Sequence, residues 1–496
     1  MLSRLIDPVL GKRISALAFP IAVAMLTQTG INVIDTIMVG HLSPEYSIAG
    51  QTAIGISLIL LWAIGGTIST MLAVGTQALS ARRFGEGDDH AAGQIFNHAA
   101  LCSIVISVIA TAVVLLTLDL VFPRIHSNPR VVELGVEYSQ YRFFGLLSMV
   151  ITIVYKGFFD GIGRTKVHMT AAITMNCVNV ILNYGLIFGV GPFPQMNVAG
   201  AGLASLIATY VGLAVMIGFT VVPKTRTRFR LYRRSGYRWS ITRNVVRVGV
   251  PGGIATLFLM TGFAFFLSIV ARLDMDIIAA ATRKLPEYVN MPLSIFASQP
   301  DSVWTQNLKL QVIDANPPIY SAATKVIMDV MTVIAVTCIA IGQATATLVS
   351  QSMGGGEGTL AERYGWTAAR IGMVIMAAVA VVIVIVPEST TRLFNPDPDV
   401  VEAGKQALRM MAASAPVVAV GMILMQSLFG AGETAFVMVA ELILHFFCLV
   451  PVAYLFGIVW NGGMVGVWGA VLLYVILLTS AMVWKFASGT WKTRRI

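Results

Sequence analysis

The residue that most clearly predicts chemistry in this sequence is an aspartate within an apolar segment. Asp35 lies among Ile, Met and Val residues, with Gln28 and Asn32 seven and three positions before it. In a helix these three side chains share one face, and a polar face does not suit contact with lipid. A charge at the centre of a membrane costs at least about 2.5–3.5 kcal/mol, so carboxylates there usually mark a path for ions or protons. The alternative is that Asp35 only forms a hydrogen bond to a neighbouring helix.

Three asparagines form a second polar face. Asn176, Asn179 and Asn183 fall at i, i+3 and i+7, so they project from one side of a helix. Amide carbonyl oxygens together with one carboxylate suit a hard cation such as Na⁺, which prefers several oxygen ligands. The alternative is that these asparagines hold helices together by hydrogen bonds, as polar residues commonly do in membranes.

Two more pairs of ionisable residues lie one helical turn apart in later apolar segments. Lys325 and Asp329 form one pair, and Glu441 and His445 form the other. At this spacing each pair can neutralise itself, which is a structural role. Alternatively, Asp329 or Glu441 helps to bind a cationic substrate. The candidate residues of a substrate cavity are therefore Gln28, Asn32, Asn176, Asp329, Glu441 and His445.

The elements that carry these residues are predicted to cross a membrane. Of the 496 residues, 56% are hydrophobic and only 12% are charged, whereas soluble domains have about 25% charged residues. A membrane span needs about 20 apolar residues, and its backbone polar groups must be paired within the segment, which favours helices over strands. About twelve segments meet this description: 17–40, 53–81, 97–122, 143–162, 167–191, 199–222, 246–271, 322–350, 366–387, 410–430, 434–458 and 464–485.

Basic residues are distributed unevenly between the two sides of the predicted membrane. With the N-terminus in the cytoplasm, the inner segments hold 22 of the 34 lysines and arginines, and the outer loops hold eight. This asymmetry predicts that both termini are cytoplasmic. The densest block, Lys224 to Arg247, favours contact with anionic lipid over a nucleic-acid site. We therefore expect a multi-pass protein of the plasma or inner cell membrane that contacts lipid and binds no nucleic acid.

The sequence contains an internal repeat. Residues 75–87 match residues 344–356 at an offset of 269, and the same offset places residues 161–165 on residues 430–434. Each half has an even number of spans, so both halves enter the bilayer from the same side and are related by a pseudo-two-fold axis along the membrane normal. The predicted fold class is an all-α integral membrane protein with about twelve transmembrane helices in two six-helix bundles.

The repeat also predicts the domain boundaries. We expect an N-terminal bundle at 1–222, of which 1–16 form a surface segment, a basic cytoplasmic linker at 223–245, and a C-terminal bundle at 246–496. Near the start of the halves, Pro20 corresponds to Pro251 at an offset of 231, whereas later positions correspond at an offset of 269. The second half therefore contains an insertion of 38 residues between these points. We place this insertion at 273–320 on the outer side, as an ordered cap or a flexible loop.

The repeated turns, the run from Asp35 to Gly40 at the end of the first helix, and the six-plus-six plan resemble the multidrug and toxic compound extrusion family. The resemblance covers nearly the whole chain except the insertion. It implies a V-shaped pair of bundles around a central cavity, and the export of drugs or metabolites against a Na⁺ or H⁺ gradient.

The resemblance also implies roles for individual residues. In the family, two polar residues four positions apart in the fifth helix face an aspartate of the first helix, with a threonine in the sixth. These positions correspond to Asn179, Asn183 and Asp35, with Ser205 in place of the threonine. The second half does not copy this site, because Phe266 stands where Asp35 would be.

We expect an antiporter of small organic molecules, not an enzyme, in which Asp35 takes up Na⁺ or H⁺ and biases the shape of the first helix. Pro20 gives that helix a place to bend, since proline removes a backbone hydrogen bond. No cofactor is expected beyond the coupling ion, no metal beyond possible Na⁺ at Asp35, Asn179 and Asn183, and the protein is expected to be a monomer.

Two alternatives remain. A flippase for lipid-linked sugars would share the fold but needs a strongly cationic cavity, and Lys and Arg occur within spans only at Arg142, Lys156, Lys325 and Arg409. The second alternative is a membrane enzyme or scaffold that transports nothing. The sequence shows no catalytic constellation, which argues against the enzyme.

Overall fold

The computed structural model describes residues 7–126, 128–233, 238–288 and 317–493, and in parts of these ranges, including Asn32, only the backbone. Most of the described residues are helical, and none of them forms a strand. The elements are α2 (Pro8–Gly40), α3 (Pro44–Leu61), η1 (Trp62–Gly66), α4 (Thr67–Gly85), α5 (Asp89–Ile125), α6 (Pro129–Phe144), α7 (Leu146–Gly161), α8 (Thr165–Phe188), α9 (Asn197–Val221), α10 (Pro223–Phe229), α11 (Trp239–Tyr288), α14 (Ile319–Gly354), α15 (Gly358–Ile385), α16 (Pro387–Phe394), α17 (Pro398–Ala431), α18 (Thr434–Ile443), η2 (Leu444–Leu449), α19 (Val450–Tyr454), η3 (Leu455–Val459), α20 (Gly463–Ala487) and η4 (Thr490–Thr493).

The helices confirm the predicted membrane architecture. Within the described ranges, eleven helices are long and apolar enough to cross a membrane, and the number is twelve when one bent pair counts as a single span. This pair is α6 and α7, which meet at a 40° bend next to Gly145. The sequence analysis predicted one span at 143–162 and no helix before it. The structure has α6 there: the side chain of Asn128 caps this helix and Pro129 begins it, although it carries Arg130, Glu133 and Glu137.

The first span differs from the prediction at its beginning. A separate surface segment was expected up to residue 16, but α2 runs without interruption from Pro8, and the side chain of Asp7 accepts hydrogen bonds from the amides of Val9 and Leu10. Leu10 and Ile14 are buried in a cluster with residues of α14, α15 and α17. This apolar contact makes residues 8–16 part of the span. The prediction for residues 1–6 lies outside the described residues.

The seventh span is longer than predicted at both ends. The expected range was 246–271, whereas α11 contains 50 residues and includes the first part of the insertion. Asp274 fixes this part to the next span, because its carboxylate accepts hydrogen bonds of 2.9 Å from the amides of Tyr320 and Ser321 at the start of α14. The choice between a cap and a loop for the insertion concerns mainly residues 289–316, which lie outside the described residues. Part of the basic linker forms the short helix α10.

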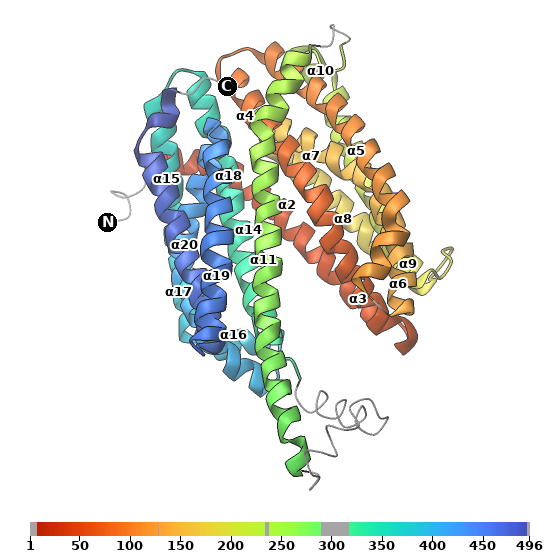
Figure 1. Cartoon of the computed structure of the whole chain (residues 1–496). Helices are drawn as coiled ribbons and strands as arrows, with labels where there is room; N and C mark the ends of the chain where they lie inside the picture. The colour runs from red at the N-terminus through yellow and green to blue at the C-terminus, as the bar shows by residue number, and fades with distance from the viewer. Residues whose placement is uncertain (1–6, 127, 234–237, 289–316, 494–496) are drawn as a thin grey trace.

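The two halves form two bundles that meet at one end (Figure 1), the end where α10 and the C-terminus lie. At this end a Cβ on Gly85 would collide with the carbonyl oxygen of Gln351, and a Cβ on Gly354 would collide with that of Arg82. The offset of 269 relates Gly85 to Gly354 and Arg82 to Gln351, so the two contacts are pseudo-symmetric, as in a two-fold interface. We call the region around these four residues the closed end.

Each bundle has its own aromatic core. In the first half, Phe96 packs on Phe158 with ring centroids 4.9 Å apart, and in the second half Phe266 packs edge-on against Trp468 at 5.3 Å. The first helix belongs to both halves, because its N-terminal part packs on the second half while its C-terminal part packs along α8. A change of shape in α2 therefore reaches both bundles.

Candidate functional site

Asp35 is the centre of a buried hydrogen-bond network in the first half. Its carboxylate is only 2% exposed; Oδ1 accepts from Asn183 Nδ2, and Oδ2 accepts from Ser205 Oγ at 3.3 Å. Asn183 Nδ2 also donates to Asn179 Oδ1 at 3.0 Å, and Asn179 Nδ2 donates to Ser205 Oγ at 3.2 Å. The structure thus brings together the four residues Asp35, Asn179, Asn183 and Ser205, as the family resemblance implied.

Three helices position these side chains. Asn179 and Asn183 lie one turn apart on α8, so both amides face the same neighbour. On α9, Gly200 packs so tightly that a Cβ there would meet the backbone of Leu186 in α8. This close approach brings Ser205 within hydrogen-bond distance of Asn179.

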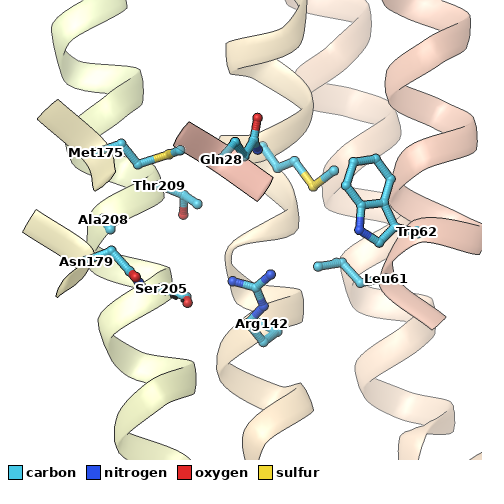
Figure 2. A pocket seen from close by; sticks show the side chains of 10 residues that line it. Gln28, Leu61, Trp62, Arg142, Met175, Asn179, Ser205, Ala208 and Thr209 are labelled. Atoms are coloured by element: carbon cyan, nitrogen blue, oxygen red, sulfur yellow. Dashed lines mark hydrogen bonds between the residues drawn. The ribbon is translucent and has the colours of Figure 1, made fainter. Parts of the chain in front are cut away.

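A pocket of about 70 Å³ adjoins the network (Figure 2). It has polar walls from several helices and an apolar side that includes an indole ring and two thioethers. The lining residues are Gln28, Leu61, Trp62, Arg142, Met149, Met175, Asn179, Ser205, Ala208 and Thr209. Asn179 and Ser205 belong both to the pocket and to the network. A molecule in this pocket would therefore be separated from the Asp35 carboxylate only by these two side chains.

Arg142 adds a fixed positive charge to this pocket. It lies in the last turn of α6, directly before the bend, and its positive charge acts electrostatically on Asp35. Its guanidinium lies 6.0 Å from the ring of Tyr138, and its Nε is buried without a hydrogen-bond partner among the described residues. The sequence placed Arg142 within a span but gave it no role. Its position depends on the bend at Gly145, which the spacing of residues does not reveal.

The other candidates from the first half have different surroundings. Gln28 lines the pocket, whereas the side chain of Asn32 lies outside what the structure describes. Asn176 is buried, but neither atom of its amide has a hydrogen-bond partner among the described residues, and it is not part of the Asp35 network. Pro20 lies within α2, fifteen residues before Asp35, among residues that pack on the second half: Ile21, directly after it, belongs to the same buried cluster as Leu10 and Ile14.

The corresponding place in the second half is apolar, as predicted. Phe266, the counterpart of Asp35, is fully buried in an aromatic core. One turn nearer the closed end, Glu441 Oε2 lies 2.9 Å from His445 Nδ1, and the Tyr474 hydroxyl donates to the same oxygen at 2.9 Å. Both members of this pair are buried, and His445 lies in the π-helical turn η2.

The second predicted pair, Lys325 and Asp329, is accessible. Lys325 Nζ lies 2.5 Å from Asp329 Oδ1, with side chains 71% and 39% exposed. In each pair the two side chains contact each other across one helical turn, so both pairs have the geometry that the structural alternative requires.

A further buried pair was missed at the sequence level. Lys156 and Asp160 lie one turn apart in α7, with Lys156 Nζ 3.0 Å from Asp160 Oδ2. Their i, i+4 spacing within an apolar segment is the same signal that drew attention to Lys325 and Asp329. It could have identified this pair as well.

Two pseudo-symmetric helical bundles that meet at one end, with a polar pocket inside one of them, define an integral membrane protein of the transporter class. The MatE family model matches residues 20–185 and 312–455, so the chain belongs to the MatE family of transporters. The two matched segments lie in the two halves of the internal repeat.

Individual relatives agree with this assignment. The chain is 24% identical to the probable multidrug resistance protein NorM of Thermotoga maritima, over 99% of this chain and 95% of the relative. Among solved structures, a MOP superfamily transporter from Pyrococcus furiosus, described as having a binding pocket of reversed polarity that suggests a different function, superposes with a TM-score of 0.81. That structure is 21% identical, covering 98% of this chain and 97% of the other. A multidrug resistance MATE family transporter in an outward-facing conformation gives a TM-score of 0.79 at 21% identity, with the same coverage.

Proposed function

We propose that the protein is a secondary antiporter that exports small organic molecules across the cell membrane in exchange for Na⁺ or H⁺, with Asp35 as the residue that binds the coupling ion. The observation that carries this proposal is the buried carboxylate of Asp35, held by Asn183 and Ser205 beside a pocket. A carboxylate in this position is stable only if its charge is compensated, and a proton or a monovalent cation can do this.

The first helix offers a way to connect ion binding to a change of shape. Pro20 and Asp35 are fifteen residues apart, about 22 Å along the helix. The N-terminal part of α2 is held to the second half: Arg13 donates to the Tyr364 hydroxyl at 3.1 Å, and Asp7 pairs with Arg363 at 2.7 Å. A rearrangement at Asp35 can therefore bend α2 near Pro20 against a fixed end.

The distribution of basic residues supports a cytoplasmic location for the closed end. The basic linker between the halves begins with α10, which lies at this end of the molecule (Figure 1). We therefore propose, by the positive-inside rule, that this side faces the cytoplasm. On this orientation the proposal assigns the closed end to the cytoplasmic side and has Asp35 take up its ion from outside.

Arg142 weakens the binding of the coupling ion in the state described. In the low dielectric of a buried pocket, a positive charge near Asp35 opposes the binding of a second cation at that carboxylate. We propose that this charge keeps the affinity for the coupling ion low enough for the ion to leave again within each cycle.

The lining of the pocket suits a small organic substrate, although at about 70 Å³ the pocket must widen before a drug-sized molecule can enter. Trp62, Met149 and Met175 supply an apolar, adaptable wall, since the thioether chain of methionine fits ligands of different shape. Relatives of this chain carry the name of multidrug resistance proteins, and we extend this activity to the present protein as part of the proposal. A flippase for lipid-linked sugars is less well supported, because Arg142 is the only basic residue among the pocket residues described.

The test is efflux from proteoliposomes that contain the purified protein and a fluorescent organic cation. An imposed Na⁺ gradient and an imposed pH gradient are applied separately. Exchange driven by one of them supports the proposal and identifies the ion. If neither gradient drives efflux, and a fluorescent lipid-linked sugar analogue is instead moved between leaflets, the flippase replaces the antiporter.

A further inference from the structure

The closed end contains a buried ion pair outside the site described so far. Lys156 and Asp160 of α7 are 9% and 0% exposed, and their charged atoms are 3.0 Å apart. Lys156 Nζ also donates a hydrogen bond of 2.8 Å to Gln343 Oε1 in α14. The pair belongs to the first half and Gln343 to the second, so this hydrogen bond crosses between the bundles.

Neutral hydrogen bonds extend the same contact. Gln77 Nε2 of α4 donates to Gln343 O at 3.0 Å and to Thr347 Oγ1 at 2.9 Å. Thr347 Oγ1 donates to the backbone oxygen of Asp160 at 3.1 Å. Each of these bonds joins one half to the other, and all of them break if the halves separate at the closed end.

The internal repeat provides a built-in comparison for this pair. At the offset of 269, Lys156 corresponds to Met425 and Asp160 corresponds to Phe429. Gln343 corresponds in the opposite direction to Val74. The same place in the other half of the interface is therefore filled by apolar side chains. Because the fold accepts these side chains in one copy, packing alone does not require the charges in the other.

The ion pair is poorly satisfied while the closed end is shut. Lys156 is the only close partner of the Asp160 carboxylate among the described residues, whereas a carboxylate can accept several hydrogen bonds. A buried ion pair with few hydrogen bonds is generally less favourable than apolar residues of similar volume. Water would reach both charges once the halves separate. The pair therefore favours opening, while the hydrogen bond from Lys156 to Gln343 favours closure.

We propose that Lys156 and Asp160 are positioning residues for transport, which lower the stability of the closed end so that the two halves can separate on each cycle. This proposal rests on the proposed function only in requiring that the halves separate at this end. It assigns no ion and no substrate to the pair, and it does not depend on the role of Asp35.

The test measures the separation of the halves directly. Spin labels are placed on Lys166→Cys in α8 and Ala435→Cys in α18, two exposed positions related by the offset of 269. The four native cysteines are first replaced by alanine. The distance distribution in lipid nanodiscs then reports the closed and open populations, and substrate exchange without any gradient reports the rate of interconversion.

Of three variants, one should shift the population toward the closed state and two should shift it toward the open state. The double variant Lys156→Met with Asp160→Phe copies the other half, so it should raise the ratio of closed to open molecules by about tenfold and slow exchange to a similar extent. Asp160→Asn leaves Lys156 buried without its counter-ion and should shift the population toward open. Gln343→Val removes only the bond across the interface and should also shift it toward open.

Ser350→Ala serves as the matched control. Ser350 Oγ donates to the backbone oxygen of Ala78 across the same interface at 2.7 Å, but it does not touch the ion pair. Its removal should not increase the closed population. Wild-type distances and exchange rates in the double variant would overturn the proposal. If the double variant does not fold, Gln343→Val, which keeps both charges, provides the second test. An unchanged distance distribution in that variant would also overturn the proposal. A failure of ion coupling at Asp35 would leave these distances unaffected, so the two proposals are tested separately.

Discussion

Asp35→Asn should abolish gradient-driven export while leaving the fold intact. Asparagine keeps the size of the side chain and one acceptor oxygen for Asn183 or Ser205, but it cannot carry the negative charge that compensates a cation. Since Asp35 is the only carboxylate in the network, one cation should be exchanged per cycle. A gradient of one pH unit, or a tenfold Na⁺ gradient, supplies about 1.4 kcal/mol per cation. Export of one uncharged substrate molecule per cation is then limited to about a tenfold concentration ratio.

The assay follows the steady-state substrate ratio in proteoliposomes at several gradients. The wild-type ratio should rise about tenfold for each tenfold step in the gradient of the coupling ion, whereas the variant should remain near one. Exchange of labelled for unlabelled substrate without a gradient is the control for folding and binding, and it should persist in the variant. Gradient-dependent accumulation by Asp35→Asn would refute the assignment. A wild-type ratio near a hundredfold per step would reveal a second coupling site.

Three further outcomes test the surroundings of this carboxylate and the second half. Ser205→Ala should weaken the apparent affinity for the coupling ion about threefold to tenfold because one hydroxyl is lost, and Ser205→Thr should restore it, as measured by the ion dependence of efflux. Arg142→Met should lower the ion concentration for half-maximal efflux about threefold to tenfold and reduce the maximal rate, since the opposing charge is gone; an unchanged ion dependence would exclude this role. Glu441→Ala should destabilise the protein by about 3–5 kcal/mol in thermal unfolding, and the additional change His445→Leu should recover part of that loss. A selective loss of cationic over neutral substrates in Glu441→Ala, with unchanged stability, would instead place this residue in a substrate cavity.

Hydropathy and the internal repeat predicted the fold because both signals are strong in a membrane protein. Each span must satisfy its own backbone in lipid, so length and apolar composition identify the helices almost without tertiary information. The repeat offset of 269 relates Gly85 to Gly354, and the structure shows that these two residues make equivalent contacts. The same approach failed for α6, because Arg130 and Glu133 give an amphipathic helix the composition of a loop.

The site was predictable only in part. The spacing of Asn179 and Asn183 showed that they share a face, but their position opposite Asp35 came from the family resemblance and not from the spacing. Arg142 could not be placed, since its direction depends on a bend between two helices. Lys156 and Asp160 could have been found from their spacing, but their contact with the other bundle depends on how the halves pack.

Because α11 is long, its end should report the movement of the second bundle relative to the first. Its 50 residues extend about 75 Å, more than twice the roughly 30 Å thickness of the hydrocarbon layer. Asp274 ties the helix to α14 where the projecting part begins, so the projection should turn together with the second bundle. A small tilt inside the membrane becomes a larger displacement at the tip. A dye attached at Tyr288, the last described residue of α11, and observed in single molecules against a fixed dye on the first bundle would therefore show a larger displacement than a dye within the membrane.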